Sequence, residues 1–213
     1  MAQSMIQIDV VSDVVCPWCY LGKRRLDKAL LQVPEIKVQV VFRPFFLDAT
    51  IPPEGRDRRE YMLAKFGAER LKTIHDPLIA AGREDGVAFD FDKITRSPNT
   101  MNAHRLLRWA HEAGGQVAVA EALFMAYWSW GQDISDIDVL KTIAIVNGFN
   151  GPDVAKHLAS DLDKKEVLEE AQSAKQIGVT GVPTYIVNKK YGMVGAQSVA
   201  AIVEMLKQVA AQT

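Results

Sequence analysis

Two cysteines three residues apart are the only thiols in this chain of 213 residues, and they are Cys16 and Cys19. A secreted domain built around disulfides carries more cysteines at wider spacing. In a reducing compartment a Cys-x-x-Cys pair is more typical of chemistry than of structure. We therefore expect the pair to exchange electrons with other thiols and disulfides.

The residues around the pair predict a strand followed by a helix. Alternating β-branched residues over 6–11 predict the strand, and Pro17 suits the first position of a helix over 18–31. Cys16 is then expected at a helix N-terminus, where free N–H groups and the helix dipole favour a thiolate. Cys19 follows one turn later on the same face. Cys16 would attack a disulfide, and Cys19 would resolve the mixed disulfide.

Two other interpretations of the cysteine pair, a zinc site and inert packing, are weaker. A zinc site needs two further Cys or His ligands, but there is no third Cys and the four His are not suitably spaced, so no metal is expected. Inert packing of two small thiols is the second alternative.

Asp13, three residues before Cys16, is a candidate proton relay or a cap of the following helix. The cap is favoured, because Asp is common at that position.

A second candidate element is the loop over residues 178–184, Gly-Val-Thr-Gly-Val-Pro-Thr. Gly-rich turns followed by Pro and a strand suit a tight turn with a cis bond at Pro183, although an ordinary trans proline is the more frequent case. If the loop folds beside Cys16, the backbone of Val182 could pair with an extended substrate and hold its sulfur near the nucleophile.

The remaining sequence predicts an α/β fold in which the strands lie near the two ends of the chain. A second strand over 36–42 completes a β-α-β unit, which implies a parallel pair. Residues 52–177 show helix signals almost throughout and predict five or six helices. A hairpin over 184–187 and 191–194 and a final helix over 197–210 close the chain.

Four segments together resemble the DsbA-like thioredoxin family, and most closely its FrnE-like branch of dithiol-disulfide isomerases. They are residues 13–23, residues 43–45, residues 97–100 with 103–106, and residues 178–184. The resemblance implies a thioredoxin-like domain over 1–50 and 178–213 and an inserted helical domain over 51–177. It also implies that Cys16 is the exposed nucleophile, Cys19 its buried partner and Pro183 a cis-proline.

The resemblance implies a thiol-disulfide oxidoreductase acting on protein or small-molecule disulfides. Pro17, Trp18, Val182 and Pro183 are its expected substrate-binding residues. An alternative on the same fold is a glutathione-dependent isomerase or transferase, of the 2-hydroxychromene-2-carboxylate isomerase or kappa-class type. A third is a module that only binds peptides. No bound cofactor is expected, but glutathione is a candidate reductant or ligand.

Composition and charge narrow the setting of this chemistry. The 25 basic and 26 acidic residues give a formal net charge of −1, so no global field favours nucleic acid or an anionic membrane. The N-terminus lacks the basic and apolar regions of a signal peptide, and no apolar run is long enough to span a membrane. These patterns predict a cytoplasmic protein and leave its oligomeric state open.

Overall fold

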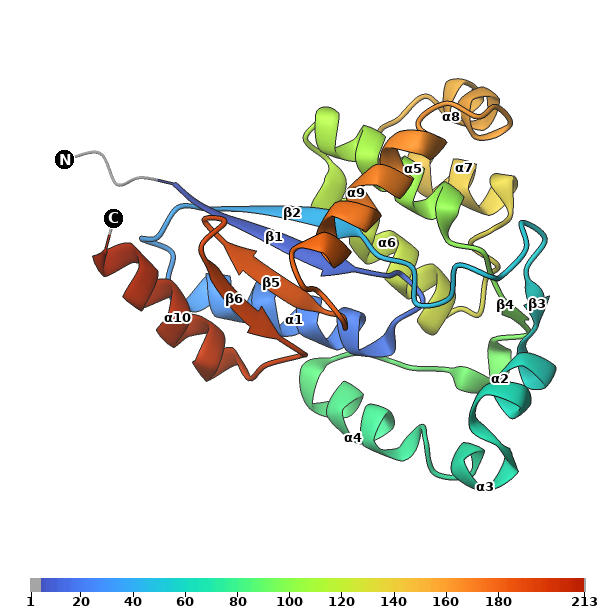
Figure 1. Ribbon diagram of the computed structural model, residues 1–213, viewed down its shortest axis with the longest axis horizontal. Helices are drawn as coiled ribbons and strands as arrows, with labels where there is room; N and C mark the ends of the chain where they lie inside the picture. Colours follow the sequence, from blue (N-terminus) through green and yellow to red (C-terminus); the bar gives the residue numbers. More distant parts are fainter. Residues whose placement is uncertain (1–4, 213) are drawn as a thin grey trace.

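The computed structural model describes residues 5–212, and its centre is a four-stranded sheet in the order β2-β1-β5-β6 (Figure 1). The strands are β1 (Ile6–Ser12), β2 (Val38–Pro44), β5 (Thr184–Val187) and β6 (Tyr191–Val194). β1 pairs parallel with β2 and antiparallel with β5, which forms a hairpin with β6. The parallel pair and the hairpin expected from the sequence are confirmed.

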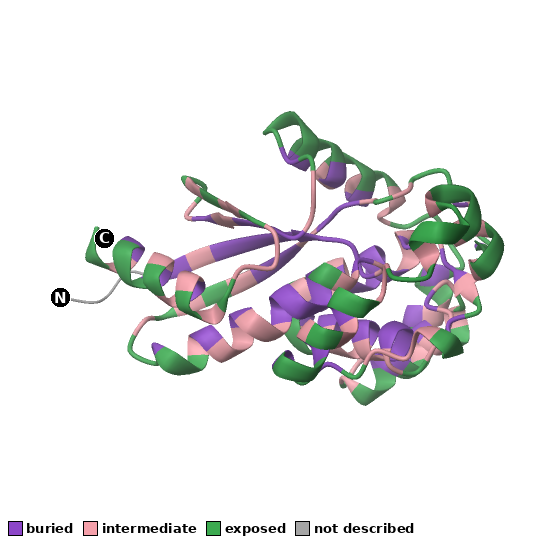
Figure 2. Ribbon diagram, turned by 90° about the horizontal axis from the view of Figure 1, so that it is seen from below, coloured by how far each residue is buried: buried purple, intermediate pink, exposed green. Residues whose placement is uncertain are grey.

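Helices lie on both sides of this sheet (Figure 2). Ile6, Ile8 and Val10 of β1 are buried in one large apolar core with residues of α1 (Pro17–Gln32) and α10 (Val199–Ala211). Val11 points to the opposite face and packs in a smaller core with residues of α9 (Lys164–Gln176). The alternation along β1 therefore fixes which helices cover each face.

The segment between β2 and β5 is mostly helical. Its helices before α9 are α2 (Arg58–Phe66), α3 (Ala68–Leu71), α4 (Asp76–Asp85), α5 (Met101–Glu112), α6 (Gln116–Trp128), α7 (Ile137–Val146) and α8 (Gly151–Leu158), with a 3₁₀ turn at Phe91–Lys93. The expected number of five or six helices is too small. Neither α2 nor α3 contains a buried residue, and α3 spans only four residues, which is too short to show a helical period in the sequence.

A short antiparallel ladder also lies in this segment, between β3 (Arg56–Asp57) and β4 (Arg96–Ser97). Two-residue strands are too short to leave an alternating pattern, which is why the sequence did not reveal them. The expected fold class, a thioredoxin-like β-α-β and β-β-α frame with helices inserted, is confirmed. The domain boundaries at 50/51 and 177/178 remain a prediction.

The helical segment is tied to the sheet at the edge strand β2. The side-chain amide of Gln116, at the start of α6, accepts a hydrogen bond from the N–H of Phe42 and donates one to the carbonyl of the same residue. Both backbone groups would otherwise remain unpaired at the sheet edge. This contact holds the helices against the strand that neighbours β1.

The sequence also led to expectations about membrane spans and about the N-terminus. Within residues 5–212, no helix has the length and apolar character needed to cross a membrane. Residues 1–4, which contributed to the interpretation of the N-terminus, lie outside the described residues.

Candidate active site

Cys16 occupies the junction between β1 and α1. It is the N-cap of α1, with extended backbone angles, and Pro17 follows at the first helical position. Its carbonyl accepts hydrogen bonds from the N–H groups of Cys19 and Tyr20, at 3.0 and 3.3 Å. No side chain in the described part of the protein caps this helix end, so the Cys16 residue lies uncapped at the positive end of the helix dipole.

The proline loop lies directly beside this sulfur. The Cys16 thiol donates to the carbonyl of Val182 at 3.6 Å, although the two residues are 166 positions apart. The peptide bond between Val182 and Pro183 is cis. The register of the sheet explains the proximity, because Val11 of β1 pairs with Thr184 of β5 and so brings the residue before Thr184 to the end of β1.

Cys16 is less accessible than the resemblance implies. Its side chain was expected to be exposed, but only 4% of the residue is accessible, because the chain around Val182 and the start of α1 enclose it. The neighbouring Trp18 is 40% exposed and Pro17 is half-buried, so the accessible surface beside the thiol belongs to these two residues.

Cys19 lies deeper, with 2% of the residue exposed. Burial raises the pKa of Cys19 well above its usual value, and hydrogen bonding and charge from Cys16 raise it further. The neighbouring Ser12 side chain and Asp13 backbone oppose the rise in the pKa of Cys19. Cys19 therefore stays protonated at neutral pH while both thiols are reduced, and the two cysteines are chemically unequal.

Asp13 does not cap α1, so that expectation is wrong. One carboxylate oxygen accepts the N–H of Leu47 at 2.8 Å, and the other lies 3.4 Å from Nε2 of His104. The residue is 1% exposed, and His104 also contacts the carbonyl of Phe45 at 3.1 Å. The carboxylate thus joins the active-site turn to the chain after β2 and to α5, while its role as a proton relay stays a prediction.

A tryptophan of the helical segment supports the same turn. The indole N–H of Trp128, at the end of α6, donates to the carbonyl of Val14 at 3.1 Å, and the residue is 1% exposed. This hydrogen bond to the turn before Cys16 was not anticipated from the sequence. A buried indole generally needs an acceptor, so some hydrogen bond could be expected. The acceptor lies 114 residues away along the chain, so no local sequence pattern identifies it.

Gly22 allows α1 to approach the proline loop closely. A Cβ at this position would lie 2.3 Å from the hydroxyl of Tyr185 and 3.0 Å from Cγ of Pro183. The Tyr185 hydroxyl is buried and has no hydrogen-bond partner among the described residues. The side chains of Pro183 and Tyr185 therefore pack so closely against α1 at Gly22 that they leave no room for a larger residue there.

We expect Gly22→Ala to lower the free energy of unfolding by about 1–3 kcal/mol, the usual cost of overpacking a core. Tyr185→Phe should be neutral or mildly stabilising, because it removes a buried hydroxyl that lacks a partner. The double variant should recover most of the loss, as measured by urea denaturation of all four proteins. Additive effects in this cycle would contradict the close approach of Gly22 to Tyr185.

The comparisons with known proteins agree with this geometry. Residues 7–207 match the family model of the DSBA-like thioredoxin domain. A probable DsbA oxidoreductase from Streptomyces coelicolor superposes with a TM-score of 0.87 and 30% sequence identity, over 98% of this chain and 91% of that one. The uncharacterized protein YwbO of Bacillus subtilis (strain 168) is 25% identical over 190 residues, covering 85% of this chain and 86% of its own.

A more distant structure has the same fold. It is the cytosolic disulfide reductase DsbM from Pseudomonas aeruginosa with GSH, with a TM-score of 0.62 and 16% identity over 96% of each chain. The match of the family model over almost the whole sequence, together with the Streptomyces coelicolor relative, establishes the family. This chain belongs to the DSBA-like thioredoxin domain family.

Proposed function

We propose that this protein is a thiol-disulfide oxidoreductase in which Cys16 attacks and Cys19 resolves. The observation that carries the proposal is the position of the Cys16 sulfur, at the start of α1 and 3.6 Å from the carbonyl of Val182. A sulfur at a helix N-terminus is a common position for a reactive cysteine, and the loop offers backbone groups that can align a substrate disulfide. Membership of the family supports oxidoreductase chemistry in general.

The exchange proceeds in two steps. The Cys16 thiolate attacks one sulfur of a substrate disulfide, forming a mixed disulfide and releasing the other sulfur as a thiol after it takes up a proton. Cys19 then loses its proton and attacks Cys16, which releases the second substrate thiol and leaves a Cys16–Cys19 disulfide. Pro17 and Trp18 on one side, with Val182 and Pro183 on the other, are the proposed substrate-binding residues.

Glutathione is the proposed reductant that returns the pair to the dithiol. The fold accommodates this tripeptide in the Pseudomonas aeruginosa reductase, whose structure contains GSH. We place the reaction in the cytoplasm, because a chain with only two cysteines carries no structural disulfides that need an oxidising compartment.

The reduction potential of the Cys16–Cys19 pair, measured in glutathione redox buffers, tests the proposal and sets the direction of electron flow. A value near that of thioredoxin, about −270 mV, would indicate a reductase, and one near about −120 mV an oxidant. A protein in which the two cysteines form no disulfide across the buffer range would contradict the proposal.

The unequal thiols lead to a second expectation. Iodoacetamide at neutral pH should add one alkyl group to the reduced protein, on Cys16, because burial and the raised pKa of Cys19 keep that thiol protonated. Fragmentation of the labelled peptide by mass spectrometry identifies the modified residue. Unfolding in urea is the control and should expose both thiols to the reagent. Modification of Cys19 first would reverse the assigned roles.

A further inference from the structure

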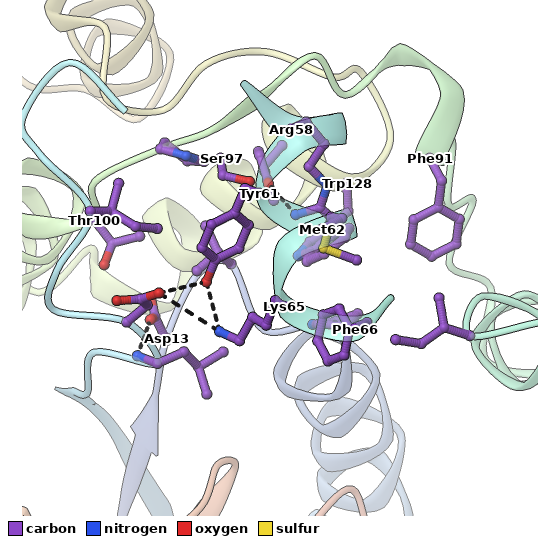
Figure 3. Close-up of a pocket in the computed structure, with 18 of the residues that line it drawn as sticks. Asp13, Arg58, Tyr61, Met62, Lys65, Phe66, Phe91, Ser97, Thr100 and Trp128 are labelled. Carbon is purple, nitrogen blue, oxygen red and sulfur yellow. Dashed lines mark hydrogen bonds and ion pairs between the residues drawn. The ribbon is translucent and has the colours of Figure 1, made fainter. Parts of the chain in front are cut away.

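A cavity of about 150 Å³ lies between the start of α1 and helices α2, α4 and α6 (Figure 3). The two residues that flank Cys16, Val15 and Pro17, are part of its wall. Most of the remaining wall is apolar and comes from the helical segment, notably Met62, Phe66, Ile74, Leu78, Phe91 and Trp128. The cavity therefore lies next to the turn that carries Cys16, although the Cys16 side chain is not itself part of the wall.

Its volume and lining limit what it can hold. An apolar cavity of about 150 Å³ accommodates a molecule the size of benzene. An extended peptide is too large for such a space, so the backbone pairing offered by Val182 and this cavity serve different parts of a substrate. The flat rings of Phe91 and Trp128, whose centres are 5.8 Å apart, favour an aromatic occupant.

Besides Oδ1 of Asp13, which lies 3.4 Å from Nε2 of His104, two buried polar atoms in the wall have no hydrogen-bond partner within residues 5–212. One is Oγ of Ser97, a residue that is 2% exposed, and the other is Nε2 of His75. Burial lowers the pKa of His75 and the charge of Arg58 lowers it further, so the ring is neutral at pH 7. Because unpaired buried polar groups are costly, these atoms indicate an occupant with a hydrogen-bonding group.

The charged residues of the wall balance one another. Asp13 and Asp48 offset Arg58 and Lys65. The carboxylate of Asp48 lies 3.9 Å from Nζ of Lys65 and accepts a hydrogen bond from the Tyr61 hydroxyl at 2.9 Å. The wall therefore offers no surplus charge to a charged ligand, and an uncharged one fits it best.

We propose that this cavity binds the compact, uncharged aromatic half of a small-molecule disulfide while its sulfur is bonded to Cys16. The inference rests on the proposed function and names its substrate class. The Cys16 thiolate attacks one sulfur of the aromatic disulfide, the S–S bond breaks, and the other aromatic thiolate leaves with the electron pair and takes up a proton. Cys19 then displaces the ring-bearing thiol from Cys16, so the dithiol loses two electrons and two thiols are formed.

The test compares 4,4′-dithiodipyridine, which is uncharged and carries a hydrogen-bond acceptor, with glutathione disulfide and insulin. Rates with the reduced protein are measured by stopped flow or turbidity, and each is divided by the rate of the same disulfide with dithiothreitol. Met62→Trp fills the cavity. The matched control is Leu63→Trp, because Leu63 is the next residue of α2, is 47% exposed and does not line the cavity.

We expect the wild-type protein to prefer the aromatic disulfide by roughly tenfold or more after normalisation, equivalent to one bound ring. Met62→Trp should remove this preference and leave the other two rates unchanged, and Leu63→Trp should retain it. Ser97→Ala should weaken binding of bis(4-pyridyl) sulfide, a thioether that cannot exchange, by about 2- to 10-fold in equilibrium dialysis.

Three results would overturn the inference. They are no preference in the wild-type protein, equal losses with all three disulfides in Met62→Trp, and a selective loss with insulin, which would assign the cavity to a protein side chain. None of them removes the proposed function, which fails separately if Cys16→Ser retains exchange. If Met62→Trp does not fold, equilibrium dialysis of the thioether with the wild-type protein still tests the inference. Absence of thioether binding would by itself refute the assignment of the cavity.

Discussion

Replacing Cys16 by serine should reduce disulfide exchange by at least about a thousandfold, because a hydroxyl at this position is a far weaker nucleophile than a thiolate. The substitution changes one atom, so the contact with the carbonyl of Val182 and the start of α1 should persist. Insulin reduction and glutathione disulfide turnover measure the loss. Unchanged melting of the variant would show that the loss is chemical.

The companion variant Cys19→Ser should fail differently. Cys16 can still form a mixed disulfide, but no second thiol can resolve it, so the covalent adduct should accumulate. Incubation with glutathione disulfide, followed by mass spectrometry of the intact protein, detects the adduct. The variant with serine at both positions is the control and should form none.

These two variants also separate the proposed function from its alternatives. Steady turnover with a glutathione-dependent substrate in Cys19→Ser would favour the isomerase or transferase, in which the second cysteine is incidental. Peptide binding that survives removal of both thiols and ignores oxidation state would favour a binding module. Full activity of Cys16→Ser would refute thiol chemistry at this site altogether.

Arg105→Ala should be the most damaging single change outside the active site, with an expected loss of about 3–5 kcal/mol in the free energy of unfolding. Arg105 is fully buried, and its guanidinium donates to the carbonyls of His157, Leu158 and Leu162 and to the side chain of Asn102. Removal of the side chain deletes these four hydrogen bonds and leaves a cavity where the buried guanidinium lay.

Urea denaturation measures this effect, with Arg59→Ala as a control for loss of an exposed arginine. The control should change the free energy of unfolding by less than about 0.5 kcal/mol. Because His104 precedes Arg105 on α5 and contacts Asp13, a loosened helix should also lower the activity of the folded fraction. A loss below about 1 kcal/mol would show that water replaces the guanidinium at the carbonyls.

The local features of the active site were predictable because each depends on neighbours in sequence. Alternating β-branched residues predict β1, and Pro17 predicts the helix that follows, so the position of Cys16 at a helix start needs no distant contact. The hairpin of β5 and β6 has the same local origin. Backbone preferences and the period of side-chain burial act over a few residues, and a single sequence contains both.

Other features depend on chain segments that only the folded structure brings together. Asp13 is typical of a helix cap in sequence, but the chain after β2 and His104 lie close enough to take its carboxylate instead. Cys16 is enclosed because β5 pairs with β1 and brings Val182 against its sulfur. These contacts are between residues that no local pattern relates.

The sequence by itself therefore determined the candidate cysteine pair, the secondary structure that presents it and the fold class. The tertiary structure alone decided how accessible the nucleophile is, which partners Asp13 takes, and that a cavity opens beside Pro17. The physical reason is that local backbone preferences are properties of short segments, whereas burial and cavities arise from the packing of side chains distant in sequence.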